Sequence, residues 1–200
     1  MNEYTFSALI SRMKYINRWG LMRSARNESL CEHSAETAFL AHILCSINNC
    51  IYGGNARGET VATAALYHDA SEILTGDMPT PVKYKNEQLK AAYKKTEAEA
   101  ARRIAQMLPP ALREDMGGYI TGEVLTDYEK MLLKAADRLS ALIKCREELN
   151  GVNREFKGAA AQQTAALHEM NMPEAEYFMQ NMLPCYDFTL DELAGKSEQE

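Results

Sequence analysis

The sequence lacks the long apolar runs that membrane proteins need. None of its apolar stretches approaches the ~20 residues that span a bilayer. Its first residues, Met-Asn-Glu-Tyr-Thr, lack the basic start and apolar core of a secretory signal peptide. We therefore expect a cytoplasmic protein without a membrane-inserted segment.

Paired cysteines and an excess of basic residues are also missing. The five cysteines are odd in number and never spaced as C-x2-C, which argues against a disulfide framework and a thiolate zinc site. Lys and Arg total 22 against 28 Asp and Glu, a formal net charge of −6. This balance argues against a broad nucleic-acid or anionic-membrane surface, although a small anion can still find a local cationic pocket.

The composition that remains is that of one globular domain. Hydrophobic residues make up 46% of the 200 residues and charged residues 25%, close to the globular average. Apolar residues such as Phe6, Leu9 and Met13 recur at helical spacing, and no stretch alternates as a hairpin strand does. Without an internal repeat or a linker, residues 1–200 are expected to form a single all-α domain of six to eight helices.

Capping residues, glycines and prolines predict where these helices begin and end. Ser29 and Glu32 match an S-x-x-E capping box, Asp127 is the expected N-cap of a strongly apolar helix, and Gly76 closes an earlier one. The predicted helical ranges are about 6–16, 30–47, 59–74, 86–108, 127–149, 155–170 and 174–182, and residues 195–200 are expected to fray.

Acidic residues inside apolar helices are the strongest chemical signal. His68 and Asp69 stand in one such helix, where an ionised carboxylate is costly unless it is paired or bound to a metal. Asp137 stands in another, with a pairing to a neighbouring Arg or Lys as the alternative explanation. Together with His33 they would supply two imidazoles and two carboxylates from three helices. Such a set suits a divalent Co, Mn, Fe, Zn or Mg ion.

A metal of this kind favours phosphate-ester hydrolysis. It lowers the pKa of bound water and neutralises charge on a phosphoryl oxygen, especially with an arginine nearby. Glu72 follows His68 by four residues and Asp69 by three, so all three are expected on adjoining parts of one helical face. There Glu72 would either transfer a proton or orient a ligand.

The two remaining histidines are expected outside the site. His42 follows His33 by nine residues, about 180° around a helix. His168 has no acidic partner at ligand spacing apart from Glu169. The site is therefore expected to hold one metal ion.

His33, His68-Asp69 and Asp137 in this order resemble the H…HD…D pattern of HD-domain metal-dependent phosphohydrolases. The closer resemblance, over essentially the whole chain, is to the bacterial 5′-deoxynucleotidase family. It rests on four segments: Ile-Asn-Arg18-Trp, Cys-Glu-His33-Ser, Tyr-His68-Asp-Ala-Ser-Glu and Leu-Thr-Gly-Asp77-Met-Pro-Thr-Pro-Val-Lys-Tyr. Departures from the family pattern touch no proposed ligand: Gly20, Cys31 and Met78.

The resemblance implies an all-α HD fold, a homodimer and hydrolysis of deoxyribonucleoside 5′-monophosphates to deoxynucleoside and phosphate. One divalent metal ion per subunit is expected, Co, Mn or another first-row ion, and ribonucleotides are expected to be poor substrates. The implied metal ligands are His33, His68, Asp69 and Asp137.

The resemblance also implies how the substrate is held. Arg18 would orient the phosphate, as a forked cation does, and Trp19 would wall the sugar pocket against a 2′-hydroxyl. Glu72 and Arg18 would take part in the reaction. The implied substrate contacts are Arg18, Trp19, His33, Asp69, Asp77, Thr80 and Asp137.

Two other functions stay open. The chain could be an HD phosphohydrolase acting on a triphosphate, cyclic or alarmone nucleotide, because the metal site alone does not choose the leaving group. It could also be a metal-bearing helical dimer that binds nucleotides or partners without turnover. A P-loop is not supported, because the Gly-Lys-Ser at Gly195 lacks the earlier glycine that the motif needs at Leu190.

Overall fold

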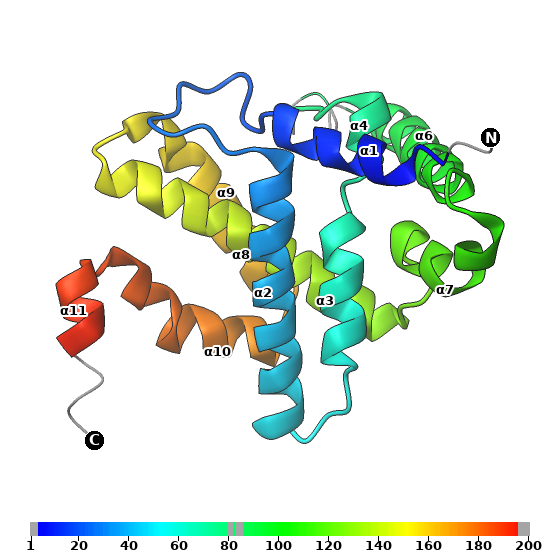
Figure 1. The fold of residues 1–200 in the computed structure, drawn as a ribbon. Coiled ribbons are helices and arrows are strands. Elements are labelled where there is room, and N and C mark those ends of the chain that lie inside the picture. Colours follow the sequence, from blue (N-terminus) through cyan, green and yellow to red (C-terminus); the bar gives the residue numbers. More distant parts are fainter. Residues whose placement is uncertain (1–3, 80–81, 83–85, 196–200) are drawn as a thin grey trace.

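The computed structural model describes residues 4–79, 82 and 86–195, which form a bundle of helices (Figure 1). Apart from an isolated β-bridge between Asn17 and Ser29, the described residues contain no strand, which confirms the all-α prediction. The α-helices are α1 (Phe6–Ile10), α2 (Leu30–Cys50), α3 (Gly58–Tyr67), α4 (Glu72–Thr75), α6 (Glu87–Gln106), α7 (Pro110–Thr121), α8 (Asp127–Asn150), α9 (Lys157–Glu169), α10 (Pro173–Asn181) and α11 (Leu190–Gly195). Three 3-10 helices accompany them: η1 (Ser11–Tyr15), η2 (Arg154–Phe156) and η3 (Leu183–Asp187).

Helix α2 runs through the middle of the bundle, with α3 and α8 packed against it (Figure 1). The larger hydrophobic core joins these three helices through side chains such as Leu44 and Leu139. A smaller core gathers residues of α1, α6 and α7. Ala65 belongs to the larger core and Ala70 to the smaller one. The turn that carries residues 68–69 therefore lies where the two cores meet.

The helix starts follow from capping chemistry. The Ser29 hydroxyl accepts the amide of Glu32 at 3.2 Å and the Glu32 carboxylate accepts the amide of Ser29 at 2.8 Å, so the predicted capping box is confirmed. The prediction of Asp127 as the N-cap of α8 is wrong, because Thr126 and Glu129 form a capping box of their own one residue earlier. Asp127 is instead the first helical residue.

The helix predicted from Glu59 to Leu74 is interrupted by a turn at 68–71. In this turn the Nδ1 atom of His68 lies 2.7 Å from the carbonyl oxygen of Ala65, which a continued α-helix would offer to the amide of residue 69. Backbone bonds of the i to i+3 type replace the α-helical pattern there. The expectation that the HD pair and Glu72 share one regular helical face is therefore wrong.

The other differences lie at helix ends and in three segments without a predicted helix, α7, η3 and α11. Helix α7 contains Gly117 and Gly118, which lower helix propensity, but it packs against α6. Gly76, at φ 76°, ends α4 as predicted. None of the described helices combines the length and the apolar character that a bilayer span requires. Residues 196–200 of the tail that was expected to fray lie outside the described residues.

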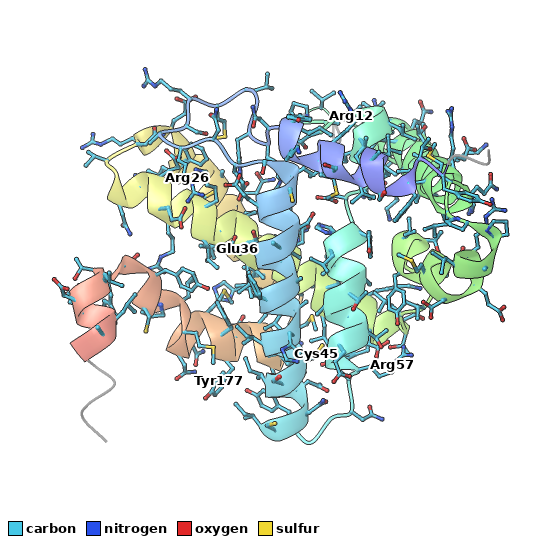
Figure 2. All side chains as sticks on the ribbon, in the orientation of Figure 1. Arg12, Arg26, Glu36, Cys45, Arg57 and Tyr177 are labelled. Atoms are coloured by element: carbon cyan, nitrogen blue, oxygen red, sulfur yellow. The ribbon has the colours of Figure 1, made fainter. Side chains whose placement is uncertain are left out.

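The loop that joins η1 to α2 is anchored on α8 by a buried carboxylate. Glu148, 2% exposed, accepts the backbone amides of Ala25 at 2.8 Å and Arg26 at 3.3 Å. The ammonium of Lys144 donates to the same carboxylate at 2.6 Å and to the carbonyl oxygen of Arg26 at 2.7 Å. The Arg26 side chain, labelled in Figure 2, is 75% exposed and pairs with Glu32 at 3.0 Å. This anchor holds the loop that carries Arg18.

Glu148→Gln is expected to lower the free energy of unfolding by about 3 kcal/mol, because one partner of a buried ion pair is lost. Burial alone would raise the pKa of Glu148, but Lys144 and the loop amides outweigh it and lower the pKa to about 2. The charged carboxylate therefore stabilises the fold above about pH 4.5, and this contribution is lost as the pH falls through about 2. Urea unfolding between pH 2 and 7 measures both effects. The exposed neighbour provides the control, Glu147→Gln, and equal stability of the two variants would contradict the anchor.

Candidate functional site

Four side chains from three parts of the fold meet beside α2. His33 comes from the second turn of α2, Asp137 from the middle of α8, and His68 and Asp69 from the turn that follows α3. The Nε2 atom of His33 lies 3.1 Å from Asp137 Oδ1 and 3.6 Å from Asp69 Oδ2. The Nε2 atom of His68 lies 3.1 Å from Asp69 Oδ2 and 4.0 Å from Asp137 Oδ1. The structure thus brings together the four residues that the sequence singled out as metal ligands.

Hydrogen bonds at the far side of each imidazole set its orientation. The hydroxyl of Ser140 donates to Glu36 at 2.5 Å, so its oxygen accepts the Nδ1–H of His33 at 2.9 Å. In the same way the Nδ1–H of His68 donates to the carbonyl oxygen of Ala65 at 2.7 Å. Both rings therefore turn Nε2 towards the two carboxylates, which is the arrangement that metal-binding histidines adopt.

Burial and the opposite charges control the protonation of this cluster. Burial lowers the pKa of His33, and the positive charge of Arg18 lowers it further. Burial would also lower the pKa of His68, but the Asp69 carboxylate outweighs it and raises that pKa to about 9. Burial would raise the pKa of Asp69 and Asp137, yet the imidazoles hold both below the ordinary value of an aspartate. The two carboxylates are therefore charged and a cation between them is favoured.

The donor set fits a divalent metal ion. The Nε2 atom of His68 is buried and makes no hydrogen bond of good geometry; its polar neighbours are carboxylate oxygens of Asp69 at 3.1 Å and Asp137 at 4.0 Å, and a metal ion held among these groups would give the nitrogen a ligand contact. Ligand atoms of His33, His68 and Asp69 all lie within 4.8 Å of one another, and Asp137 lies beside them. Two imidazole nitrogens and two carboxylate oxygens suit a borderline ion such as Zn, Co, Mn or Fe. Asp137 contacts the histidines, so pairing with a neighbouring basic residue does not explain it.

Arg18 and Trp19 lie beside the cluster, on the loop before α2. The Arg18 side chain is 15% exposed, and Nη1 donates to Glu28 Oε2 at 3.1 Å. Burial would lower the pKa of Arg18, but the carboxylates of Glu28, Asp137, Asp69 and Asp77 raise it. Arg18 is therefore a buried cation that faces the acidic side of the cluster. This is where a phosphate on the metal ion would need a cation.

Trp19 contacts residues from two other parts of the chain. Its ring lies 5.3 Å from the ring of Phe156, which belongs to η2 late in the chain, and its Nε1–H donates to Glu28 at 2.8 Å. The backbone of Trp19 has φ 62°, a left-handed conformation that a bulky residue adopts only when its surroundings hold it there. The indole is therefore fixed by contacts from two distant segments.

The other predicted residues are placed as follows. Glu72 is buried at the start of α4, three residues after Asp69. Asp77 follows α4 and is half-buried. Thr80 lies outside the described residues. His42 is exposed on α2, and exposed His168 bonds Glu176 of α10 at 2.6 Å, so both lie away from the cluster as predicted.

Sequence reasoning missed three supporting residues: Glu28, Glu36 and Ser140. Glu36 follows His33 by three residues on α2, and Ser140 follows Asp137 by three on α8 (Glu36 is labelled in Figure 2). Side chains at this spacing share a helical face. The spacing was a usable signal for these two, whereas Glu28 sits in a loop and gave none.

Comparison with known proteins gives consistent results. The model of a family described as "5′-deoxynucleotidase YfbR-like" matches residues 5–186. The Escherichia coli protein named 5′-deoxynucleotidase YfbR is 44% identical over 197 residues, which cover 98% of this chain and 99% of that protein. A 5′-deoxynucleotidase of Vibrio cholerae is 43% identical over 194 residues, covering 97% of this chain and all of that one.

Solved structures share the fold. An HD-domain phosphohydrolase from Listeria innocua superimposes with a TM-score of 0.79 at 20% sequence identity, covering 96% of each chain. An HD phosphohydrolase of cyanophage S-2L, solved with dA and one catalytic Zn²⁺ ion, has a TM-score of 0.54 at 21% identity and covers all of this chain and 96% of its own. The predicted HD-domain fold is confirmed by these similarities.

Proposed function

The chain belongs to the YfbR-like 5′-deoxynucleotidase family, and from this we propose that it hydrolyses deoxyribonucleoside 5′-monophosphates to deoxynucleoside and phosphate. The observation that carries the proposal is the convergence of two imidazole Nε2 atoms and two aspartates beside the buried cation Arg18. Such a site combines a place for a divalent ion with a place for a phosphate.

We propose that one divalent ion per chain is held by His33, His68, Asp69 and Asp137. When bound, such an ion lowers the pKa of a water molecule and neutralises charge on the phosphoryl group. The cyanophage structure contains Zn²⁺, and for this chain Co, Mn or another first-row ion suits the same ligands. Elemental analysis of the purified protein, before and after dialysis against a chelator, identifies the ion that it retains.

Side chains of the protein would bind the phosphate and the rest of the nucleotide. Arg18 binds the phosphate oxygens and stabilises the charge that develops on them. Its terminal nitrogens form a planar fork, of which Nη1 also bonds Glu28.

We further propose that Asp77 and Thr80, which follow α4 in the sequence, contact the nucleotide. Substituting either should raise KM more than it lowers kcat, and an unchanged KM would remove that residue from the substrate site.

Glu72→Gln is expected to lower kcat about a hundredfold, because a buried carboxylate next to the cluster is suited to transfer a proton. KM and metal content should stay close to those of the wild type. Steady-state kinetics together with elemental analysis distinguish the two roles of Glu72. Loss of the metal ion would instead assign it to orienting a ligand, and unchanged turnover with unchanged metal would exclude both roles.

Trp19→Ala is expected to lower the ratio of kcat/KM for dAMP over AMP about tenfold or more. A rigid ring at the sugar can exclude a 2′-hydroxyl, which an open pocket rejects only weakly. The affinity for inorganic phosphate, measured as competitive inhibition, should change little. A ratio equal to that of the wild type would show that Trp19 has no part in selectivity.

The function itself is tested by phosphate release from dAMP, dTMP, AMP and an aryl phosphate. The protein is first freed of metal with a chelator and then supplied with Co, Mn, Zn or Mg. Release from the deoxynucleotides with little from AMP supports the proposal. If these monoesters release no phosphate but chromatography shows hydrolysis of a triphosphate or cyclic nucleotide, the chain is a different HD phosphohydrolase, and no reaction with any metal would favour a binding role.

We also propose that the protein is a cytoplasmic homodimer. Its five cysteines are all free thiols, as is usual in a reducing compartment. The side chains of Phe39 and Leu190 are 71% and 81% exposed, and apolar surface of this kind is commonly covered in an assembly. Light scattering of the purified protein should give twice the mass of the chain, and cell fractionation should place it in the cytoplasmic fraction.

A further inference from the structure

Glu28 connects the two residues proposed to bind the phosphate and to select the sugar. A single oxygen, Oε2, accepts the Nη1–H of Arg18 at 3.1 Å and the Nε1–H of Trp19 at 2.8 Å. The Glu28 side chain is only 10% exposed. Its backbone takes part as well, because its carbonyl oxygen accepts the amide of Arg18 at 2.9 Å.

Trp19 depends on such contacts for its position. Its left-handed backbone, at φ 62°, is unfavourable for a large side chain and persists only where neighbours hold it. The neighbours are the Glu28 carboxylate at the indole nitrogen and the fully buried Phe156 ring, 5.3 Å away and inclined by 58°. Without the carboxylate, the indole keeps the Phe156 ring and the guanidinium of Arg18, which lies 5.8 Å from the centre of the indole and itself loses its ion pair with Glu28.

We propose that Glu28 is a positioning residue that sets the selectivity for deoxyribose, by fixing the indole of Trp19 relative to the guanidinium of Arg18. To exclude the 2′-hydroxyl of a ribonucleotide, the indole has to keep its position when the substrate binds. Because both side chains bond the same oxygen, the distance between the phosphate-binding and sugar-facing groups is set by one carboxylate. This inference rests on the proposed function, since it assigns selectivity within that site.

The decisive variant is Glu28→Ala, compared with Glu28→Gln. In the alanine variant the ratio of kcat/KM for dAMP over AMP should fall about tenfold, with AMP gaining relative to dAMP. In the glutamine variant an amide oxygen still accepts the indole N–H, so the ratio should stay within about threefold of the wild type. Each variant removes the negative charge that pairs with Arg18, so kcat/KM should fall for dAMP and for AMP in the alanine and in the glutamine variant.

Trp19 is the only tryptophan in the sequence, which gives a second readout that does not depend on turnover. In Glu28→Ala the emission should shift to longer wavelength and acrylamide should quench it more strongly, whereas Glu28→Gln should remain close to the wild type. The matched control is Glu147→Ala, which removes a charge from the same 200 Å³ pocket without contacting Arg18 or Trp19. It should change neither the ratio nor the emission.

A second variant covers the case in which Glu28→Ala does not fold. Phe156→Leu loosens the other support of Trp19 and leaves the bond between Arg18 and Glu28 in place, so it should lower the ratio without weakening phosphate inhibition. An unchanged ratio and unchanged emission in folded Glu28→Ala would overturn the inference, even where the wild type hydrolyses dAMP selectively. Failure of the wild type to hydrolyse any deoxynucleotide would overturn the proposed function instead.

Discussion

Asp137→Asn is expected to abolish hydrolysis of dAMP, with a loss on the order of a thousandfold or more. Asn has the shape of Asp but lacks its charge, so the proposed ligand set is left with a single carboxylate. Asp137 Oδ1 lies 3.1 Å from the Nε2 atom of His33, on the face where the ion would bind. Elemental analysis and the dependence of rate on added metal measure the weaker binding directly.

A melting experiment separates this loss of metal from a loss of folding. A ligand that binds only the folded state raises the melting temperature. Added Co or Mn should therefore raise the melting temperature of the metal-free wild type and leave that of Asp137→Asn almost unchanged. The matched control lies on the same helix, Asp127→Asn, because Asp127 is fully exposed at the start of α8. If Asp137→Asn kept the metal-induced shift and its turnover, Asp137 would not be a ligand.

The residues that could be predicted are those whose type conflicts with their surroundings. A carboxylate such as Asp137 in a helix that packs the core needs a partner, and this conflict is visible without a structure. The start of α2, which places His33, follows from the local capping chemistry of Ser29 and Glu32. Local rules of this kind transfer directly from sequence to structure.

Contacts across long sequence separations could not be predicted. Ser140 bonds His33 across 107 positions, and Glu28 bonds Arg18 across a loop without periodicity. The turn at His68 was missed for another reason. The imidazole of His68 bonds the backbone carbonyl oxygen of Ala65, and the spacing of apolar residues does not reveal such a bond. Helix α7 was missed because packing against α6 outweighs the low helix propensity of its two glycines.

Arg18→Lys is expected to lower kcat/KM for every phosphate monoester several-hundredfold, because one charged donor group replaces a planar fork. The terminal ammonium keeps the charge that pairs with Glu28, so the support of Trp19 remains. The ratio of dAMP to AMP turnover should therefore stay near that of the wild type, in contrast to Trp19→Ala.

The comparison separates binding of the phosphate from selection of the sugar. Steady-state kinetics give kcat/KM for dAMP, AMP and an aryl phosphate. The aryl ester has no sugar, so Trp19 cannot discriminate for or against it. The control is Arg102→Lys, on the exposed side of α6, which should leave all three rates unchanged. An aryl phosphate rate that survives Arg18→Lys would mean that Arg18 does not act on the phosphate. A collapse of the dAMP to AMP ratio would mean that the shared Glu28 oxygen needs the guanidinium itself to hold the indole.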